Sequence, residues 1–228
     1  MSSLPKHLQI SEMLVREIKA GVRVEGDRLP PERQLAEELG VAVGTLRKAL
    51  ADLDQKGMLE RIQGSGNYVR DNPGVDNIYA LFRLELTQGG GLPTATLLSV
   101  DRQEKQQDVP PLDDDPMSFR FRRIRALDGI KIAAEEMWLG GRRAKEICAQ
   151  DVGDSLYQFY RDWLGFRITR VEDRVSVSDL PSWAVSYFPE TTHPAWGYIE
   201  RLSLDETGAL AEFSRTWFDP HLARFVAR

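Results

Sequence analysis

Four donor side chains near the start of the sequence have the types and spacing needed to bind nucleic acid. They are Arg33, Thr45, Arg47 and Lys48. An arginine binds a phosphate or a guanine edge through two parallel hydrogen bonds, and lysine and threonine donate to phosphates. We therefore expect Arg33 to reach a phosphate or a base edge, Arg47 to bind guanine or phosphate, and the other two to contact phosphates.

Two short helices and a hairpin must hold these donors, and the segment 26–69 predicts all of them. Helices are expected over Glu32–Leu39 and Val43–Lys56, each closed by a glycine. Short strands are expected over Leu59–Gln63 and Asn67–Val69. An amphipathic helix over about Leu4–Ala20 precedes them. Helix, tight turn, helix and β-wing is the pattern of a winged helix-turn-helix, whose second helix enters the DNA major groove.

The second helix of this pattern has an apolar side and a polar side. Its apolar stripe consists of Leu46, Ala49, Leu50 and Leu53. Because that stripe packs inward, the opposite side is left with Val43, Gly44, Arg47, Lys48 and Ala51. The tip of the hairpin is Gly64, Ser65 and Gly66, and its glycines allow a close approach to the DNA backbone or minor groove.

The first seventy residues resemble the GntR family of bacterial transcription regulators. The motifs that carry the resemblance are GDRLPPER from Gly26, Leu35-Ala36, LGV from Leu39, TLRKAL from Thr45 and GSG from Gly64. The resemblance implies DNA contacts by Arg33, Val43, Gly44, Thr45, Arg47, Lys48, Gly64, Ser65 and Gly66.

Two positions depart from the family pattern, which usually has Ser or Thr followed by Arg there. Ala42 removes the expected side-chain N-cap of the recognition helix, a loss of about 1 kcal/mol. Val43 removes a common base-contacting arginine and can instead pack on a thymine methyl. The operator is therefore expected to differ from the usual half-site, with specificity resting on Arg33, Arg47 and DNA shape.

Beyond a breaker cluster at 71–74 the pattern changes to strands with fewer helices. Helices are expected over Val75–Gln88, Arg142–Gln150 and Ser155–Leu164. Strands are expected over Thr94–Gln103, Ser118–Leu127, Lys131–Leu139, Arg167–Ser178, Gly197–Leu204 and Leu210–Phe218, with a hairpin turn at Asp128-Gly129 and a loop over Gln106–Pro116. This mixture predicts an α+β domain built on an antiparallel sheet. The domain bounds expected are 1–70 for the winged helix-turn-helix, 71–78 for a linker and 79–228 for the second domain.

Arg123 and Arg125 are a second group of candidate binding residues. Two residues apart on a strand, they face the same side. Guanidinium groups that face inward from a sheet are costly unless an anion or carboxylates satisfy them. A structural salt bridge from Arg125 to Glu135 and an anion-binding site are both compatible with this pattern.

Residues 79–228 resemble the UTRA ligand-binding domain of the HutC-like branch, which has a chorismate-lyase-like fold. The resemblance rests on RIRALDG from Arg123, Ala133-Ala134-Glu135, DSLY from Asp154, GFRITR from Gly165 and Glu212-Phe213-Ser214. It implies an effector pocket lined by Arg123, Arg125, Glu135, Ser155, Tyr157 and Glu212. Arg83 is added as an effector residue, since it lies where small hydroxyl residues often help to bind phosphate. Sugar phosphates, urocanate-like carboxylates, phosphonates and sulfonates are all compatible.

Composition limits the remaining functional classes. The 228 residues are 42% hydrophobic and 29% charged, and nothing approaches the run of about 18 apolar residues of a membrane span. The net charge is −5; residues 1–70 carry 11 basic and 10 acidic residues, so DNA affinity must come from a few placed cations. No secretion signal is seen, and a cytoplasmic location is expected. The single cysteine, Cys148, is expected to be a small buried side chain.

No cofactor or metal is expected, because the three histidines are scattered. The expected function is transcription regulation, by a repressor that binds a two-fold symmetric double-stranded DNA operator as a homodimer. A small anionic metabolite would modulate that binding. One alternative is a small-molecule enzyme, whose lyase-like domain would act on a carboxylate. Others are a sensor whose head no longer binds DNA, and a winged helix that makes protein contacts.

Overall fold

The computed structural model describes residues 5–72, 81–153, 155–189 and 194–227. The chain forms two compact units, residues 2–83 and 84–226, with the last residues grouped with the first unit. The predicted linker 71–78 lies largely outside the described residues, and the predicted domain bounds stay a prediction.

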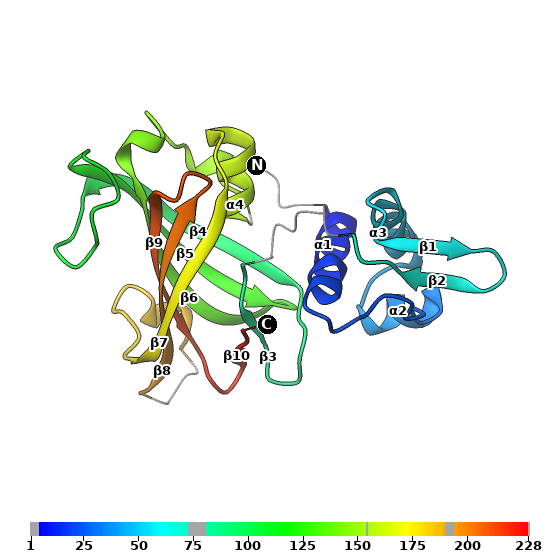
Figure 1. Ribbon diagram of the computed structural model, residues 1–228. Helices are drawn as coiled ribbons and strands as arrows, with labels where there is room; N and C mark the ends of the chain where they lie inside the picture. The colour runs from blue at the N-terminus through cyan, green and yellow to red at the C-terminus, as the bar shows by residue number, and fades with distance from the viewer. Residues whose placement is uncertain (1–4, 73–80, 154, 190–193, 228) are drawn as a thin grey trace. The chain divides into compact units, whose positions relative to one another are not determined.

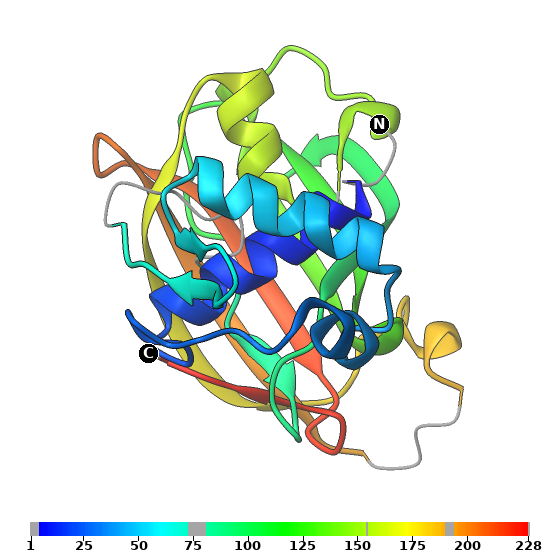
Figure 2. The same ribbon diagram turned by 90° about the vertical axis from the view of Figure 1, so that its right-hand side faces the viewer.

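The first unit, called the head here, has three helices and a two-stranded wing. Its elements are α1 (Lys6–Lys19), α2 (Glu32–Glu38), α3 (Val43–Gln55), β1 (Leu59–Ile62) and β2 (Gly66–Val69). The wing is antiparallel, with Leu59 opposite Val69. Figure 2 shows α1 and α3 crossing each other. The predicted winged helix-turn-helix is confirmed.

The core of the head is formed by the apolar stripes of α1 and α3. The predicted stripe of α3 is fully buried, and on α1 the buried apolar residues are Ile10, Met13, Leu14, Val15 and Ile18. Neither α2 nor α3 has a side-chain cap, since Pro31 and Ala42 occupy their N-cap positions. These helices therefore depend on packing rather than on capping, α3 against α1 and α2 against α3.

The second unit, called the sheet domain here, contains a six-stranded antiparallel sheet in the order β4-β5-β6-β9-β8-β7 (Figure 1). The strands are β4 (Pro93–Glu104), β5 (Met117–Leu127), β6 (Ile130–Gly140), β7 (Ile168–Ser178), β8 (Trp196–Asp205) and β9 (Leu210–Phe218). The predicted turn joins β5 to β6, with positive φ at Asp128 (50°) and Gly129 (80°). The predicted α+β class with an antiparallel sheet is confirmed.

Both faces of this sheet are covered over part of their area. On one face, α4 (Leu156–Phe159) and the π-helix that continues it (Tyr160–Leu164) pack on Phe119, Phe121, Met137 and Leu139. On the other face the loop before β5 and the segment before β8 cover aromatic residues of the sheet, among them Trp138, Phe213 and Trp217. Polar residues that the sheet holds beneath such cover are removed from water.

The predicted helix over Val75–Gln88 is wrong in its described part. Residues 84–86 form a short strand, β3 (Leu84–Leu86), that pairs with β10 (Ala223–Phe225) in a separate antiparallel ribbon. All three residues of β3 are buried, and Arg224 donates to Glu85 at 3.0 Å. A strand at the far end of the chain thus overrides the local helical pattern. Residues 75–80 lie outside the described residues.

The predicted helix over Arg142–Gln150 is also wrong. Only two short 3-10 turns are present there, Gly141–Arg143 and Ala149–Asp151. The backbone N–H of Arg142 donates to the carboxylate of Asp113 at 3.0 Å, so a side-chain contact takes the place of a helical bond.

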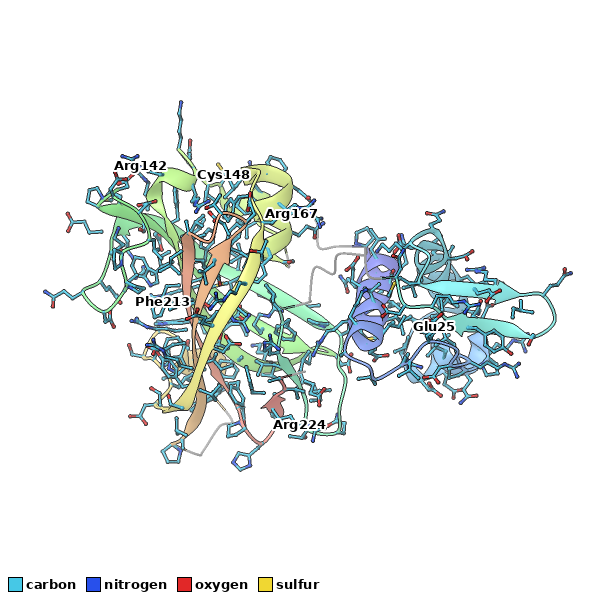
Figure 3. All side chains as sticks on the ribbon, in the orientation of Figure 1. Glu25, Arg142, Cys148, Arg167, Phe213 and Arg224 are labelled. Atoms are coloured by element: carbon cyan, nitrogen blue, oxygen red, sulfur yellow. The ribbon has the colours of Figure 1, made fainter. Side chains whose placement is uncertain are left out.

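Cys148 is exposed, contrary to the prediction that it is buried (Figure 3). It immediately precedes the second 3-10 turn, and its carbonyl accepts from the backbone N–H of Asp151 at 3.0 Å. Because this backbone hydrogen bond closes the turn, the turn forms without the thiol packing against other residues. In the part of the chain that the structure describes, no helix is long and apolar enough to cross a membrane.

Candidate DNA-binding surface and candidate effector site

The side chains predicted to read DNA lie on the outward side of α2, α3 and the wing. Gly44, Arg47 and Lys48 are exposed on α3, where Val43 and Thr45 are half-buried. Arg33 is exposed on α2. Because Leu46, Ala49, Leu50 and Leu53 turn the opposite side of α3 into the core, this side is available to a partner.

The cations of this surface differ in how they are paired. Arg47 donates to Glu32, with Nε and Oε2 2.6 Å apart, although its side chain is 65% exposed. Glu32 starts α2, so this ion pair ties the first turn of one helix to the recognition helix. Within the described residues, Arg33 and Lys48 form no ion pair. Two cations are therefore free for phosphates, and Arg47 is held in one orientation.

The wing tip is ordered by its own side chains. The hydroxyls of Ser65 and Tyr68 are 2.7 Å apart and share a hydrogen bond. Gly64 (φ 76°) and Gly66 (φ 138°) have backbone conformations that L side chains rarely adopt. The tip that the sequence predicts is thus a defined turn whose shape requires glycine at both positions.

In the sheet domain, Arg123, Arg125 and Glu135 come together on one face of β5 and β6. Arg123 lies opposite Glu135 in the strand register. A terminal nitrogen of Arg123 donates to Oε2 of Glu135 at 2.7 Å, and Nε of Arg125 lies 3.9 Å from Oε1. All three residues are buried. Burial alone would raise the pKa of Glu135, but the charges of the two arginines outweigh it, and the pKa is lowered.

A second carboxylate, Glu212, is buried on β9 among hydroxyl groups. Tyr160 donates to it at 2.5 Å, Ser203 at 3.0 Å and Tyr157 at 3.3 Å. Burial raises the pKa of Glu212, and the hydrogen bonds from Tyr160 and Ser203 offset this only in part. Burial, followed by the charge of Glu212, also raises the pKa of Tyr160 and of Tyr157, so both phenols remain protonated donors.

A third arginine joins the same face from β8. Both Nε and a terminal nitrogen of Arg201 donate to Asp173 on β7, at 2.6 Å and 2.9 Å. The guanidinium also hydrogen-bonds Tyr157, and together these partners raise the pKa of Arg201 against the opposing effect of burial. The strand register places Arg201 on the same face as Glu135. Arg201 lies opposite Ser214 of β9, which lies opposite Met137 of β6, and Met137 is two residues from Glu135.

We call this group the polar cluster. It consists of Arg123, Arg125, Glu135, Tyr157, Tyr160, Asp173, Arg201, Ser203 and Glu212. Sequence reasoning did not identify Tyr160, Asp173, Arg201 or Ser203. A signal existed for two of them, since Arg201 and Ser203 are two residues apart on a predicted strand, but the register that brings them to Glu212 could not be read from the sequence.

Two of the predicted effector residues have other places in the structure. Ser155 is the N-cap of α4, and its hydroxyl accepts from the backbone N–H of Gln158 at 3.2 Å. Arg83 precedes β3 and groups with the head rather than with the sheet domain. It is not part of a helix, although the predicted helix Val75–Gln88 included it. Their roles toward a ligand stay predictions.

The polar cluster is suited to recognition by hydrogen bonds and charge. Its three guanidinium groups are donors with fixed geometry, and its hydroxyls and carboxylates can bind hydroxyl or amine groups of the same molecule. Among the residues that the structure describes, no group of three or more histidine, cysteine or acidic side chains could hold a metal ion.

Two family models match the sequence. The one described as "Bacterial regulatory proteins, gntR family" matches residues 6–69, and the one described as "UTRA domain" matches residues 90–223. Each match lies within one unit of the structure, the first in the head and the second in the sheet domain.

Comparison with curated proteins gives relatives that align over most or nearly all of the chain. The HTH-type transcriptional regulator SmoD of Agrobacterium fabrum is 46% identical, over 99% of this chain and 97% of the relative. The mannosyl-D-glycerate transport/metabolism system repressor MngR of Escherichia coli is 27% identical, over 99% and 96%. The HTH-type transcriptional repressor NagR of Bacillus subtilis is 25% identical over 78% of this chain and 75% of its own length.

Solved structures share the fold at lower identity. YydK from Bacillus subtilis superposes with a TM-score of 0.55 and 19% identity, covering 99% of both chains. PhnF from Mycobacterium smegmatis gives a TM-score of 0.52 and 21% identity, over 94% of this chain and 98% of that one. The order of a winged head followed by a sheet domain is therefore shared with known structures.

Proposed function

Since the chain belongs to the GntR family of bacterial transcriptional regulators and carries a UTRA domain, we propose that it is a repressor released from DNA by a small anionic metabolite. The relatives are named transcriptional regulators and repressors, so the chain is a regulator rather than an enzyme. Beyond this role as a regulator, we propose the direction of the response, the class of ligand, and the residues that bind DNA and ligand.

The head would bind a two-fold symmetric operator as part of a homodimer in the cytoplasm. A single small reading head rarely gives enough affinity, and the symmetry of an operator mirrors that of the protein. Arg33, Val43, Gly44, Thr45, Arg47 and Lys48 would form the reading surface, together with Gly64, Ser65 and Gly66 of the wing. The exposure of the charged members and the paired geometry of Arg47 support this role.

The metabolite would bind at the polar cluster. The observation that carries this proposal is the presence of three arginines on one face of the sheet with little exposure to water: Arg123 and Arg125 are buried, and the side chain of Arg201 is 13% exposed. A structural core rarely needs so many buried ions, because well-packed apolar residues usually give equal or greater stability. Glu135 and Glu212 would bind hydroxyl or amine groups of the ligand, and Arg83, Ser155 and Tyr157 remain predicted contacts.

The name of one relative supports a ligand that combines hydroxyl groups with an acid. MngR is named for a mannosyl-D-glycerate transport and metabolism system. Mannosyl-D-glycerate carries several hydroxyls and one carboxylate, and the polar cluster offers both cationic donors and carboxylate acceptors. We propose a ligand of the same general chemistry, an anionic sugar derivative or a similar polyhydroxylated acid.

Ligand and operator would oppose each other through a coupling free energy, typically about 1–3 kcal/mol. This coupling is reciprocal: if the ligand weakens operator binding by a given factor, the operator weakens ligand binding by the same factor. The ligand would favour a separation of the two heads that does not match the half-sites.

The test is fluorescence anisotropy of the purified protein on the intergenic DNA upstream of its own gene, against a scrambled duplex at about 0.15 M salt. A panel of phosphorylated, sulfonated and carboxylated sugars is then added. Preference for the upstream DNA, weakened by one class of anion, is the expected result. Preference that no anion changes would contradict the effector part, and equal binding to both duplexes would contradict regulation from this site.

A further inference from the structure

Arg28 lies beside the wing although it comes before α2 in the sequence. Its backbone forms an isolated antiparallel bridge with Tyr68 of β2. Flanking hydrogen bonds join Leu29 N to Asn67 O and Val69 N to Asp27 O, both at 2.9 Å. The segment that carries Arg28 is thus fixed along the outer edge of β2.

The side chain of Arg28 occupies the space that a larger residue at Gly66 would need. A Cβ atom placed on Gly66 would lie 3.1 Å from Nε of Arg28 and 3.8 Å from Cζ. Gly66 is the last residue of the wing tip and the first residue of β2. Because glycine has no Cβ, the guanidinium can lie directly against the backbone of the wing.

Arg28 also differs from its neighbours in charge balance. In the head, Arg23 pairs with Glu17 at 2.6 Å, Arg61 with Asp54 at 3.5 Å, and Arg70 with two glutamates. Arg28 is exposed, and within the described residues it forms no ion pair. A cation without a carboxylate partner can neutralise a phosphate without first breaking an ion pair.

From this geometry we propose that Arg28, held against the edge of the wing, contacts DNA. It would bind a phosphate of the sugar–phosphate backbone next to the wing tip. The proposal rests on the DNA-binding function proposed above. It gives a second reason for glycine at position 66: besides its positive φ, the absence of a side chain leaves room for the guanidinium of Arg28. A phosphate contact fixes the position of the wing on the duplex and carries no sequence information.

The experiment uses the full-length protein and a duplex that the wild type enriches from a randomised DNA library, with a scrambled duplex as the second probe. Arg28→Ala should weaken binding to both duplexes by a similar factor, on the order of 3- to 10-fold. The slope of log K against log salt concentration should fall by about 1 for each Arg28 that contacts a phosphate. Lys6→Ala is the matched control, since Lys6 is exposed and forms no ion pair among the described residues.

Gly66→Ala provides a second variant, because the added Cβ would lie 3.1 Å from Nε of Arg28 and push the guanidinium aside. The alanine also strains the backbone at φ 138°, so the loss that remains in the Arg28→Ala background measures this strain, and the excess loss when Arg28 is present measures the effect on the guanidinium, as a double-mutant cycle separates them. Thermal unfolding of each variant checks that the head remains folded.

Three outcomes would overturn the proposal. They are an unchanged salt slope for Arg28→Ala, a loss confined to the enriched duplex, and an equal loss for Lys6→Ala. Arg47→Ala separates this inference from the proposed function. If Arg47→Ala loses the enriched duplex and Arg28→Ala does not, only the role of Arg28 is wrong. If the wild type enriches no duplex, DNA binding itself is wrong.

Discussion

The head and the sheet domain both contain arginine–glutamate ion pairs, which are exposed to water in the head and buried in the sheet domain. In the head, Arg47 and Glu32 pair at 2.6 Å while the arginine remains 65% exposed. In the sheet domain, Arg123 and Glu135 pair at 2.7 Å with side chains only 4% and 10% exposed. Water screens the first pair and is excluded from the second, so similar distances correspond to different free energies.

The exposure of an ion pair therefore decides which substitutions can separate DNA binding from folding. An exposed pair contributes about 0–1 kcal/mol to stability, so its members can be changed with effects confined to DNA binding. Breaking a buried pair leaves an uncompensated charge, at a cost of about 3–5 kcal/mol. If the polar cluster binds the ligand as proposed, ligand binding and stability are coupled in the sheet domain, whereas DNA binding and stability are nearly independent in the head.

The largest expected effect is that of Glu135→Gln, which tests the buried side of the comparison. It leaves Arg123 and Arg125 without their carboxylate partner, and we expect the free energy of unfolding to fall by about 3–5 kcal/mol. All five tryptophans lie between residues 138 and 217, so tryptophan fluorescence in a urea titration reports on the sheet domain alone.

Glu172→Gln is the matched control in the same unit. Glu172 pairs with Arg170 at 2.6 Å at the surface of β7, and its substitution should change stability by less than about 1 kcal/mol. Equal losses for the two variants would remove the distinction between buried and exposed pairs in this protein.

Arg47→Ala tests the exposed side. We expect it to lower the discrimination between the enriched and the scrambled duplex by about 1–3 kcal/mol for each half-site, because a bidentate base contact is lost. Stability should stay within about 0.5 kcal/mol of the wild type. Anisotropy titrations on both duplexes measure the first quantity, and circular dichroism during thermal unfolding measures the second.

Arg70→Ala is the control for Arg47, since Arg70 is exposed and paired with Glu25 and Glu60. It should retain most of the discrimination. A loss of discrimination as large as that of Arg47→Ala would mean that total charge, and not the reading helix, selects the DNA.

The ionisation of Asp205 is expected to make the stability of the sheet domain depend on pH. Burial would raise its pKa, but hydrogen bonds from Thr207, Arg143 and backbone N–H groups lower the pKa to about 2. Because the folded-state pKa lies below the unfolded value near 3.8, the stabilisation is complete above about pH 4 and is lost as the pH falls toward 2. Asp205→Asn should lower stability at neutral pH and flatten this part of the profile.

The measurement is the urea midpoint by tryptophan fluorescence between pH 2 and 7. Asp101→Asn serves as control, because Asp101 is 47% exposed and pairs loosely with Arg120 at 3.3 Å. An Asp205→Asn profile parallel to that of the wild type throughout would show that this carboxylate does not set the acid limb.

The smallest expected effect belongs to Glu32→Gln, which releases Arg47 without removing it. Loss of a negative charge should strengthen binding to both duplexes, while the ratio between them falls by about 2- to 5-fold because the guanidinium is no longer held in one orientation. Gln34→Glu, on the exposed surface of the same helix, adds charge without touching Arg47 and should weaken both equally. An increased ratio for Glu32→Gln would contradict the orienting role.

The head could be predicted from the sequence because its structure is local. The spacing of Leu46, Ala49, Leu50 and Leu53, together with the glycines after each helix, defines helices whose partners are close in the chain. The polar tip and the exposed donors follow from the same pattern. What the sequence did not give is the pairing of Arg47 with Glu32 and of Arg28 with the wing, since both depend on how the elements pack.

The sheet domain was predicted as a class but not in its details. Alternation identified six of its strands, yet the helix expected at Val75–Gln88 gave way to a strand whose partner lies near residue 224. Arg123, Arg125, Glu135, Tyr157 and Glu212 were found through the family resemblance. Arg201 and Asp173 were missed because only the register of β7, β8 and β9 brings them to that face.

The exposed Cys148 has a practical consequence for spectroscopy. As the only cysteine in the chain, it accepts a single spin label or fluorophore without any engineered substitution. A homodimer would then carry one probe per subunit, and pulsed electron resonance would return one inter-probe distance. Comparing that distance with and without an added anion would report directly whether the two subunits move relative to each other.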